Sequence, residues 1–303
     1  MPQSLCPCCQ SELRRKRERV CDPDSGQTFA IDNCVQCGAG RTAPVPENLD
    51  TFYQQQYHGG RHGVTARICD SRRLDIIGQQ TKTIGGKRLL DIGCGDGTLM
   101  AAARSAGWSV MGTETHPDRA RQRGLDVVTS LDEATKSGPF DVITMWHSLE
   151  HFKDPNDAIE SVSRLIDPGG VAIVAVPNYA SLQATIFGRH WLHLDVPRHL
   201  SHFTMNSIDR LAQRHGMTAT RIRRSEFEYD LMGWIQSGLN AIGLPPNLLM
   251  KTLTGRTSNA SMVIRAISFV GGCVLGAATL LPTVIGCQTG RGGTLIFVLR
   301  RAR

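Results

Sequence analysis

Four cysteines near the N-terminus have the spacing of metal ligands. They form two CxxC pairs with 24 residues between them: Cys6, Cys9, Cys34 and Cys37. Two such turns can close a tetrahedral Zn²⁺ site, and four thiolates leave no open coordination position, so we expect a structural ion. A redox or chance pair is the alternative, and the spare thiols of Cys8 and Cys21 could replace a ligand.

A glycine-rich loop that contains carboxylates is the second chemical feature. Residues 90–97 read Leu-Asp-Ile-Gly-Cys-Gly-Asp-Gly. Glycines let a ligand approach the backbone closely. Asp91 and Asp96 would repel the pyrophosphate of a dinucleotide, whereas they suit a ligand that carries an ammonium and a sulfonium group. The GxGxG spacing also differs from the GxGxxG of dinucleotide-binding proteins.

A β-α-β unit must position this loop. The pattern predicts a strand over 88–92, a helix from Thr98 to Gly107, and a second strand over 109–113 that ends at Glu114. An acidic residue at that point is typical of a nucleotide-binding fold. Later apolar runs predict strands over 126–128, 140–145, 171–176, 218–227 and 292–299. The expected class is therefore α/β with a Rossmann-like parallel sheet.

With its motifs in this order, the chain resembles the class I S-adenosylmethionine-dependent methyltransferases, whose glycine-rich first motif is DIGCGDG here. Residues 140–155, which include Glu150 and His151, are similar to the branch related to quinone biosynthesis enzymes. The resemblance implies a seven-stranded sheet, S-adenosylmethionine as methyl donor, and a role for Glu114 in binding the ribose hydroxyls. An ordinary strand-end carboxylate is the alternative for Glu114. The donor-binding residues implied by the resemblance are Asp91, Gly93, Gly95, Gly97, Glu114, Ser130 and Met145.

Four histidines are candidates for a catalytic base. His147 and His151 follow the fourth strand, and His199 and His202 lie in the long loop after the fifth. Ligands of an open parallel sheet bind beyond the carboxyl ends of its strands, so we expect this loop to cover the methyl donor. Histidine can take a proton near neutral pH. Each of the four has the alternative role of fixing a loop through hydrogen bonds.

An apolar helical insertion is expected over residues 230–290, before the last strand. No charged residue occurs over 231–250 or over 266–290, and the second stretch is long enough to cross a bilayer. Its glycines and Pro282 predict that it is broken into short helices. We expect a hairpin at a membrane interface or a lid over an apolar acceptor, with a buried helix pair or a dimer surface as the alternative.

Composition limits the class of protein and its partners. The chain is 41% hydrophobic and 20% charged, as globular proteins are, and its formal charge of +7 suits RNA or an anionic membrane surface. The cysteines are not spread as a disulfide framework and the first residues lack a signal peptide pattern, which favours the cytoplasm. Arg198 either binds an acidic acceptor or forms an ion pair with Asp195.

These features predict three consecutive parts: a zinc-ribbon-like module over 1–45, a linker and helical lead-in over 46–85, and a Rossmann-like methyltransferase domain over 86–303. The predicted activity is methyl transfer from S-adenosylmethionine to an oxygen or carbon atom of a small-molecule or lipid-like acceptor. Residues 231–290 would supply a peripheral membrane contact. The alternative is an rRNA or tRNA methyltransferase that contacts RNA through the zinc module, and a third interpretation is a non-catalytic adaptor.

Overall fold

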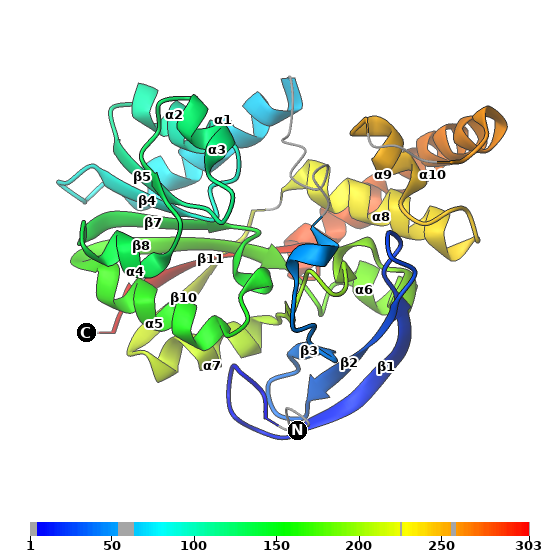
Figure 1. Ribbon diagram of the computed structural model, residues 1–303, viewed down its shortest axis with the longest axis horizontal. Helices are drawn as coiled ribbons and strands as arrows, with labels where there is room; N and C mark the ends of the chain where they lie inside the picture. The colour runs from blue at the N-terminus through cyan, green and yellow to red at the C-terminus, as the bar shows by residue number, and fades with distance from the viewer. Residues whose placement is uncertain (1–4, 54–63, 225, 256–258, 303) are drawn as a thin grey trace. The chain divides into compact units, whose positions relative to one another are not determined.

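The computed structural model describes residues 5–53, 64–224, 226–255 and 259–302 (Figure 1). By their contacts the residues form two compact units. The first unit comprises Met1–Gly59, Pro177–Ser207 and Arg223–Leu295, and the second comprises Gly60–Val176, Ile208–Ile222 and Ile296–Arg303. The contacts therefore group the N-terminal residues with the loop after the fifth strand and with the insertion, unlike the three consecutive parts that the sequence predicts.

A seven-stranded sheet forms the second unit, in the order β10-β11-β8-β7-β4-β5-β6. Strands β4 to β8 run parallel, and β10 pairs antiparallel with β11. The strands are β4 (Arg88–Ile92), β5 (Ser109–Thr113), β6 (Val127–Val128), β7 (Phe140–Trp146), β8 (Ile166–Pro177), β10 (Met217–Ile222) and β11 (Thr294–Arg301). The seven-stranded Rossmann-like sheet predicted from the sequence is confirmed.

Helices cover both faces of this sheet. Figure 1 shows α1 and α2 over one face and α4, α5 and α7 over the other. Helix α5 begins where the sequence predicts, because the Asp154 side chain accepts a hydrogen bond from the backbone N–H of Asn156 and Pro155 follows at the first position. The helical segments are α1 (Val64–Gln80), α2 (Thr98–Ser105), α3 (Asp118–Gln122), α4 (Leu131–Thr135), η2 (Leu149–His151), α5 (Pro155–Leu165) and α7 (Met205–Arg214).

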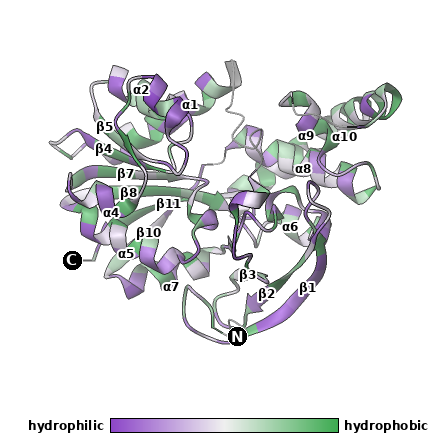
Figure 2. Cartoon of the chain, viewed as in Figure 1, coloured by the Kyte–Doolittle hydropathy of each residue, from purple (hydrophilic) through white to green (hydrophobic). Residues whose placement is uncertain are grey.

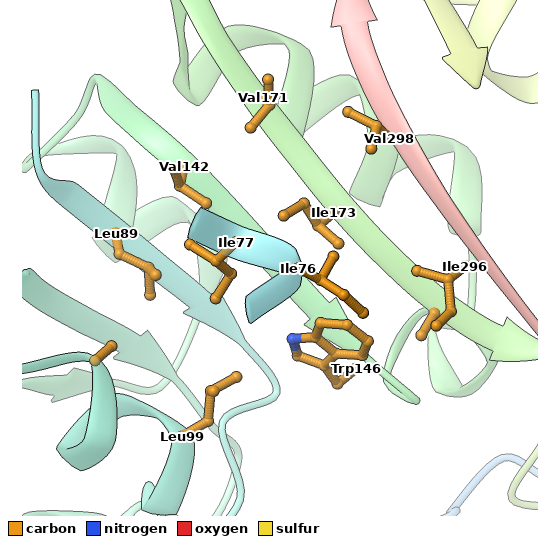
Figure 3. Packing of buried hydrophobic residues seen from close by; sticks show 12 residues of the cluster. Ile76, Ile77, Leu89, Leu99, Val142, Trp146, Val171, Ile173, Ile296 and Val298 are labelled. Carbon is orange, nitrogen blue, oxygen red and sulfur yellow. The ribbon is translucent and has the colours of Figure 1, made fainter. Parts of the chain in front are cut away.

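The core of the second unit lies between α1 and the sheet (Figure 3). Ile77 of α1 packs with Leu89 of β4, Val142 of β7 and Ile173 of β8, and all four are fully buried. Each such side chain contributes roughly 1.5–3 kcal/mol to folding. This packing holds the carboxyl ends of β4 and β7 at one edge of the sheet, where the glycine loop begins.

A four-stranded antiparallel sheet lies in the first unit, in the order β1-β2-β3-β9. Its strands are β1 (Leu13–Cys21), β2 (Thr28–Cys34), β3 (Gly40–Ala43) and β9 (Ser201–His202). The last strand comes from the loop after β8, and its His202 pairs with Gly40. A side chain at Gly40 would bring a Cβ atom to 2.9 Å from Cγ2 of Ile31, so only glycine permits this close pairing.

Helices form the rest of the first unit. They are η1 (Asp50–Phe52), α6 (Leu182–Phe187), η3 (Gly188–His190), η4 (Leu192–Leu194), α8 (Phe227–Ala241), α9 (Leu248–Leu253) and α10 (Met262–Thr289). The predicted strand over 218–227 is wrong at its end: β10 stops at Ile222 and Phe227 begins α8. Arg223 and Arg224, which follow the strand, are both exposed.

The apolar insertion before the last strand is confirmed, but the prediction that its second half is broken is wrong. Helix α10 is continuous over 28 residues with Pro282 inside it. Its glycines permit close packing: a Cβ atom on Gly272 would lie 2.5 Å from Leu249 of α9, and one on Gly276 would lie 3.3 Å from Ile235 of α8. This packing offsets the cost of about 1 kcal/mol that glycine adds inside a helix. By length and composition alone, α10 could cross a membrane, as no other helix of the described residues could.

Candidate active site and metal cluster

The glycine loop follows β4 in a left-handed conformation. Gly93, Gly95 and Gly97 have φ values of 74°, 57° and 76°, which favour glycine. A Cβ atom on Gly93 would lie 2.6 Å from Cβ of Ser148, and one on Gly97 would lie 2.4 Å from Leu125. A Cβ atom on Gly95 would have no neighbour within 4 Å. Two of the glycines therefore serve packing, whereas the exposed backbone of Gly95 borders open space that a ligand can enter.

Glu114 follows β5 directly and lies against this loop. Its Oε2 accepts a hydrogen bond from the backbone N–H of Gly95 at 2.8 Å. Its own backbone N–H donates to the carbonyl of Val128 at 3.0 Å, so that the end of β6 lies beside it. Ser130 comes two residues later and caps α4, its Oγ accepting from the backbone N–H of Glu133 at 3.2 Å. Glu114 and Ser130 thus follow neighbouring strands at one edge of the sheet.

Asp91 lies in β4, buried, one strand away from Glu114. Its Oδ1 accepts a hydrogen bond from Oγ1 of Thr144 at 2.7 Å. Burial raises the pKa of Asp91 to about 6, although the Thr144 hydrogen bond and the charge of Arg73 lower it, and the charge of Glu114 adds to the rise. Met145 follows Thr144 in β7 and is fully buried. The ionised carboxylate of Asp91 is poorly solvated because it is buried, so a cationic ligand beside it would be favoured.

Arg73 of α1 is a residue that the sequence reasoning missed. Its guanidinium lies over the ring of Trp146, 4.7 Å from the ring centroid, and its charge acts on Asp91. The side chain therefore brings a positive charge to the ends of β4 and β7. No local pattern in the helix 64–80 indicates this contact, because Trp146 is more than sixty residues away in the sequence.

His147 and His151 lie at the carboxyl end of β7, in the second unit. The backbone N–H of His147 donates to the carbonyl of Ala175 in β8 at 2.9 Å, and its Nδ1 is 3.5 Å from Oε1 of the buried Glu150. The φ of His147 is 54°, an uncommon value for a residue with a side chain. His151 ends η2 and is half-buried. The edge at which both residues stand is where open parallel sheets bind ligands.

His199 and His202 lie in the first unit, each with a partner there. Nδ1 of His199 is 2.9 Å from the carbonyl oxygen of His193, and Nε2 of His202 is 3.0 Å from Oγ1 of Thr42. Burial lowers the pKa of His202 well below its ordinary value. Both contacts fit the alternative role of fixing the loop, and the catalytic role of these two residues stays a prediction.

Arg198 is a buried side chain whose charge is balanced within the first unit. Its Nη2 is 2.7 Å from Oδ1 of Asp195 and 2.8 Å from Oδ1 of the buried Asp22, and its Nη1 donates to the carbonyl of Phe52 at 3.1 Å. Of the two roles considered from the sequence, the ion pair with Asp195 is the one present. Asp22 was not foreseen, because only the fold brings the turn after β1 to this loop.

The four cysteines of the two CxxC pairs come together in the first unit. Their sulfur atoms lie within 4.8 Å of one another, with 3.5 Å from Cys6 to Cys37 and 3.3 Å from Cys9 to Cys34. A tetrahedral Zn²⁺ with bonds of about 2.3 Å needs sulfur atoms slightly less than 4 Å apart, so this donor set fits. The contact between Cys6 and Cys37 lowers the pKa of Cys6 and raises that of Cys37, so this pair favours one thiolate.

Comparison with known proteins gives the family. Residues 61–222, just over half of the chain, match a family model described as a methyltransferase domain. This chain belongs to the class I S-adenosylmethionine-dependent methyltransferases. The matched segment holds the glycine loop, Glu114 and Asp91, together with β4 to β8 and β10. The donor-binding roles of these residues were predicted from the same resemblance and remain predictions.

Two curated relatives of this methyltransferase are ubiquinone biosynthesis O-methyltransferases. The protein of Actinobacillus pleuropneumoniae serotype 5b is 35% identical over 127 residues, 37% of this chain and 54% of that protein. The protein of Bordetella avium is 27% identical over 198 residues, 59% of this chain and 80% of that protein. This chain thus spans about half the length of the first relative. Among solved structures, coclaurine N-methyltransferase is similar with 16% identity, a TM-score of 0.47, and coverage of 80% of this chain and 73% of that one.

Proposed function

We propose that this methyltransferase moves the methyl group of S-adenosylmethionine to an oxygen or carbon atom of a small apolar acceptor. The observation that carries the proposal is the contact of Glu114 with the backbone of Gly95 beside the buried Asp91. A carboxylate pair around exposed backbone complements a ligand that carries an ammonium, a sulfonium and ribose hydroxyls. The relatives named as O-methyltransferases support a small-molecule acceptor.

Each residue of the pocket would have one task. Glu114 would accept hydrogen bonds from the two ribose hydroxyls, and Asp91 would face the ammonium group of the donor. Arg73 would face the donor carboxylate, since it supplies a positive charge beside Asp91. Ser130, after the neighbouring strand, would flank the adenine. The bound donor supplies an electrophilic methyl group, and His147 or His151 would accept the proton that the acceptor loses.

Donor binding is tested with Glu114→Gln. We expect calorimetry to show at least a tenfold weaker affinity for S-adenosylmethionine, because a hydrogen bond to a charged group contributes about 1.5–3 kcal/mol. Glu160→Gln is the matched control, since Glu160 is a half-buried residue of α5 that pairs with Arg164. Equal affinities of wild type and Glu114→Gln would contradict the proposed pocket. Failure of the wild type to transfer radiolabelled methyl groups to any cell extract would favour the adaptor interpretation.

We propose further that Cys6, Cys9, Cys34 and Cys37 hold a structural Zn²⁺. The four thiols leave no coordination position for a substrate. The carbonyl of Cys37 accepts a hydrogen bond from Oγ1 of Thr204 at 2.8 Å, which joins the cysteine turn to another segment of the first unit. The ion would therefore stabilise the four-stranded sheet and take no part in methyl transfer. Metal analysis of the purified chain should find one zinc per molecule.

Peripheral membrane contact through α10 is the third part of the proposal. Ten large apolar side chains of this helix are 43–85% exposed: Met262, Val263, Ile267, Phe269, Val270, Val274, Leu280, Leu281, Val284 and Ile285. Figure 2 shows the hydrophobic colour along the helix. Monomeric soluble proteins rarely expose apolar patches beyond about 300–600 Å². Residues 231–291 also contain three arginines but no Asp or Glu, which suits an anionic bilayer surface better than a second copy of the same face.

The packing of α10 favours a helix that lies in the interface over one that crosses the bilayer. It packs along α8, which has only 15 residues and would span about 22 Å, less than the roughly 30 Å of the hydrocarbon core. Helix α8 also carries the buried polar side chains of Gln236 and Ser237, which a spanning hairpin would take into lipid. The exposed side of α10 alone would therefore enter the boundary between headgroups and acyl chains.

Vesicle flotation tests this contact. The wild type should float with vesicles of phosphatidylcholine and phosphatidylglycerol, and the variant with Val270→Gln, Val274→Gln and Leu281→Gln should not. Ile68→Gln is the matched control, because Ile68 is an exposed isoleucine of α1. A wild type that stays unbound, or a lipid-free dimer that the triple variant dissociates, would overturn the membrane contact.

RNA methylation is not favoured. The basic run at residues 14–19, on which that alternative depended, is partly used within the first unit. Arg15 forms an ion pair with Asp32 at 2.6 Å, and Arg17 donates to the carbonyls of Gly188 and Ala184 at 2.8 and 3.0 Å. Guanidinium groups held in this way are less available to phosphates, and the relatives named above act in ubiquinone biosynthesis by name.

A further inference from the structure

A cavity of about 370 Å³ lies inside the first unit and contains none of the donor-pocket residues. Three segments of that unit form its walls: the end of β1 with the following turn (19–23), the loop 189–196, and the connection between α8 and α9 (240–247). We propose that this cavity is a second binding site of the chain, whose ligand is an apolar organic anion. The proposal does not depend on methyl transfer.

The walls of the cavity are apolar and its rim is cationic. Val20, Trp191 and Leu194 lie in the lining but are almost fully buried, whereas the partly exposed Leu244 gives apolar surface to a ligand body. Arg19 and Arg189 also line it and are exposed. Within the described part of the chain the guanidinium of Arg19 forms no hydrogen bond or ion pair, which leaves it available to an anionic group, and Nε of Arg189 donates to Nε2 of His190 at 3.3 Å.

The other titratable groups of the lining do not cancel this positive charge. Burial, followed by the charge of Arg189, lowers the pKa of His190, so this ring is neutral at neutral pH. Asp195 lies on the wall, but its Oδ1 accepts hydrogen bonds from Nε and Nη2 of Arg198 at 3.0 and 2.7 Å. Arg198 is shared between Asp195 and Asp22, and the two arginines of the lining outnumber its one carboxylate, so the lining carries a net positive charge.

Polar side chains hold one wall of the cavity in place. Asn240 donates from Nδ2 to the carbonyl of His190 at 3.3 Å and to Oδ1 of Asn247 at 3.1 Å. Its Oδ1 accepts from the backbone N–H of Asn247 at 3.0 Å and from Nε2 of Gln236 at 2.8 Å. One amide thus joins the loop 189–196 to the α8–α9 connection. A cavity bounded by such bonds exists before a ligand arrives, which lowers the entropy cost of binding.

Ion pairs fix the opposite wall. Arg198 joins Asp195 of the loop to Asp22 of the turn after β1. In the same turn, Oδ1 of Asp24 is 2.5 Å from Nζ of Lys251 in α9. All three segments that enclose the cavity are therefore connected by side-chain contacts, so that its shape does not depend on apolar packing alone.

Backbone strain is concentrated at this cavity. The described residues contain five non-glycine residues with positive φ, and three of them line it: Arg19 at 54°, Asp195 at 34° and Asn247 at 58°. Such conformations are uncommon for arginine and more frequent for aspartate and asparagine, and they cluster at ligand sites. Each of the three lies in a different wall segment.

Calorimetry with the full chain at pH 7.5 tests the site, using 2-naphthoate as the anionic probe and 2-naphthol as its neutral counterpart. We expect 2-naphthoate to bind once per chain. In the double variant Arg19→Gln and Arg189→Gln the affinity for 2-naphthoate should fall at least tenfold, and the affinity for 2-naphthol should not change. Arg14→Gln is the matched control, because Arg14 is an exposed arginine of β1 that pairs with Glu12 and does not line the cavity.

Three outcomes would overturn the proposal: no saturable binding of 2-naphthoate, equal binding of both probes, or an equal loss of binding in the control. S-adenosylmethionine affinity is measured on the same samples to separate the two sites. A chain that binds 2-naphthoate but not S-adenosylmethionine would support the cavity and overturn the donor pocket. A chain that binds S-adenosylmethionine but not 2-naphthoate would support the donor pocket and overturn the cavity.

Discussion

Replacing Asp91 with Asn should stabilise the second unit while it weakens the proposed donor site. Burial raises the pKa of Asp91 from 3.8 to about 6. The folded chain therefore binds this proton more tightly than the unfolded chain, and ionisation of Asp91 opposes folding. A shift of about 2 pH units corresponds to about 3 kcal/mol. The neutral amide removes that penalty and can still accept the hydrogen bond from Thr144.

The sign of the pH dependence follows from this linkage. Well below pH 3.8 Asp91 is protonated in both states, so wild type and Asp91→Asn should be equally stable. Between pH 4 and pH 6 the wild type should lose stability relative to the variant. Above about pH 6.5 the difference should be constant, with the variant more stable by up to about 3 kcal/mol.

Urea unfolding from pH 4.5 to pH 8, followed by circular dichroism, measures this difference. Asp126→Asn is the control, because Asp126 is an exposed aspartate of the same unit. At pH 8 the affinity of Asp91→Asn for S-adenosylmethionine should fall by about tenfold, as expected for the loss of one charge interaction. A variant less stable than wild type at pH 8, or a stability difference independent of pH, would refute the reasoning.

Three further predictions concern other parts of the molecule. Gly93→Ala should lower the free energy of unfolding by about 2–4 kcal/mol, because it adds a clash with Ser148 to a left-handed φ. Gly95→Ala should lower it by about 1 kcal/mol and mainly weaken donor binding. Urea unfolding measures the stability of both variants, and calorimetry measures their donor affinity. Arg198→Met should destabilise the first unit by about 3–5 kcal/mol, as it leaves a buried carboxylate without its cation, and a thermal midpoint equal to wild type would contradict this. Cys37→Ser should release most of the bound zinc in a metal assay without changing donor affinity; unchanged zinc content would exclude the proposed ligand set.

Local patterns were sufficient to predict much of the second unit. The parallel strands β4, β5, β7 and β8 are short apolar runs that end in glycine or polar residues, and Asp154 with Pro155 marks the start of α5. These signals depend on turn chemistry and periodicity, which act over a few residues. The CxxC spacing places two thiols on each turn, and the need of one tetrahedral ion for four ligands predicts that the two turns meet.

Contacts between distant segments could not be predicted in this way. The sequence shows no sign that His202 pairs with Gly40, or that Arg73 lies over Trp146. The prediction of short helices over 266–290 was also wrong, because the glycines of α10, which normally weaken a helix, here allow α8 and α9 to approach.

The amino-acid sequence by itself determined the order of the elements, the glycine loop and the residue types available for donor and metal binding. Only the tertiary structure decided that the N-terminal strands, the loop after β8 and the insertion form one unit, and that they enclose a charged-rim cavity. The physical reason is that local patterns bias each segment's conformation, whereas its neighbours are chosen by burial and ion pairing between residues as far apart as Asp22 and Arg198.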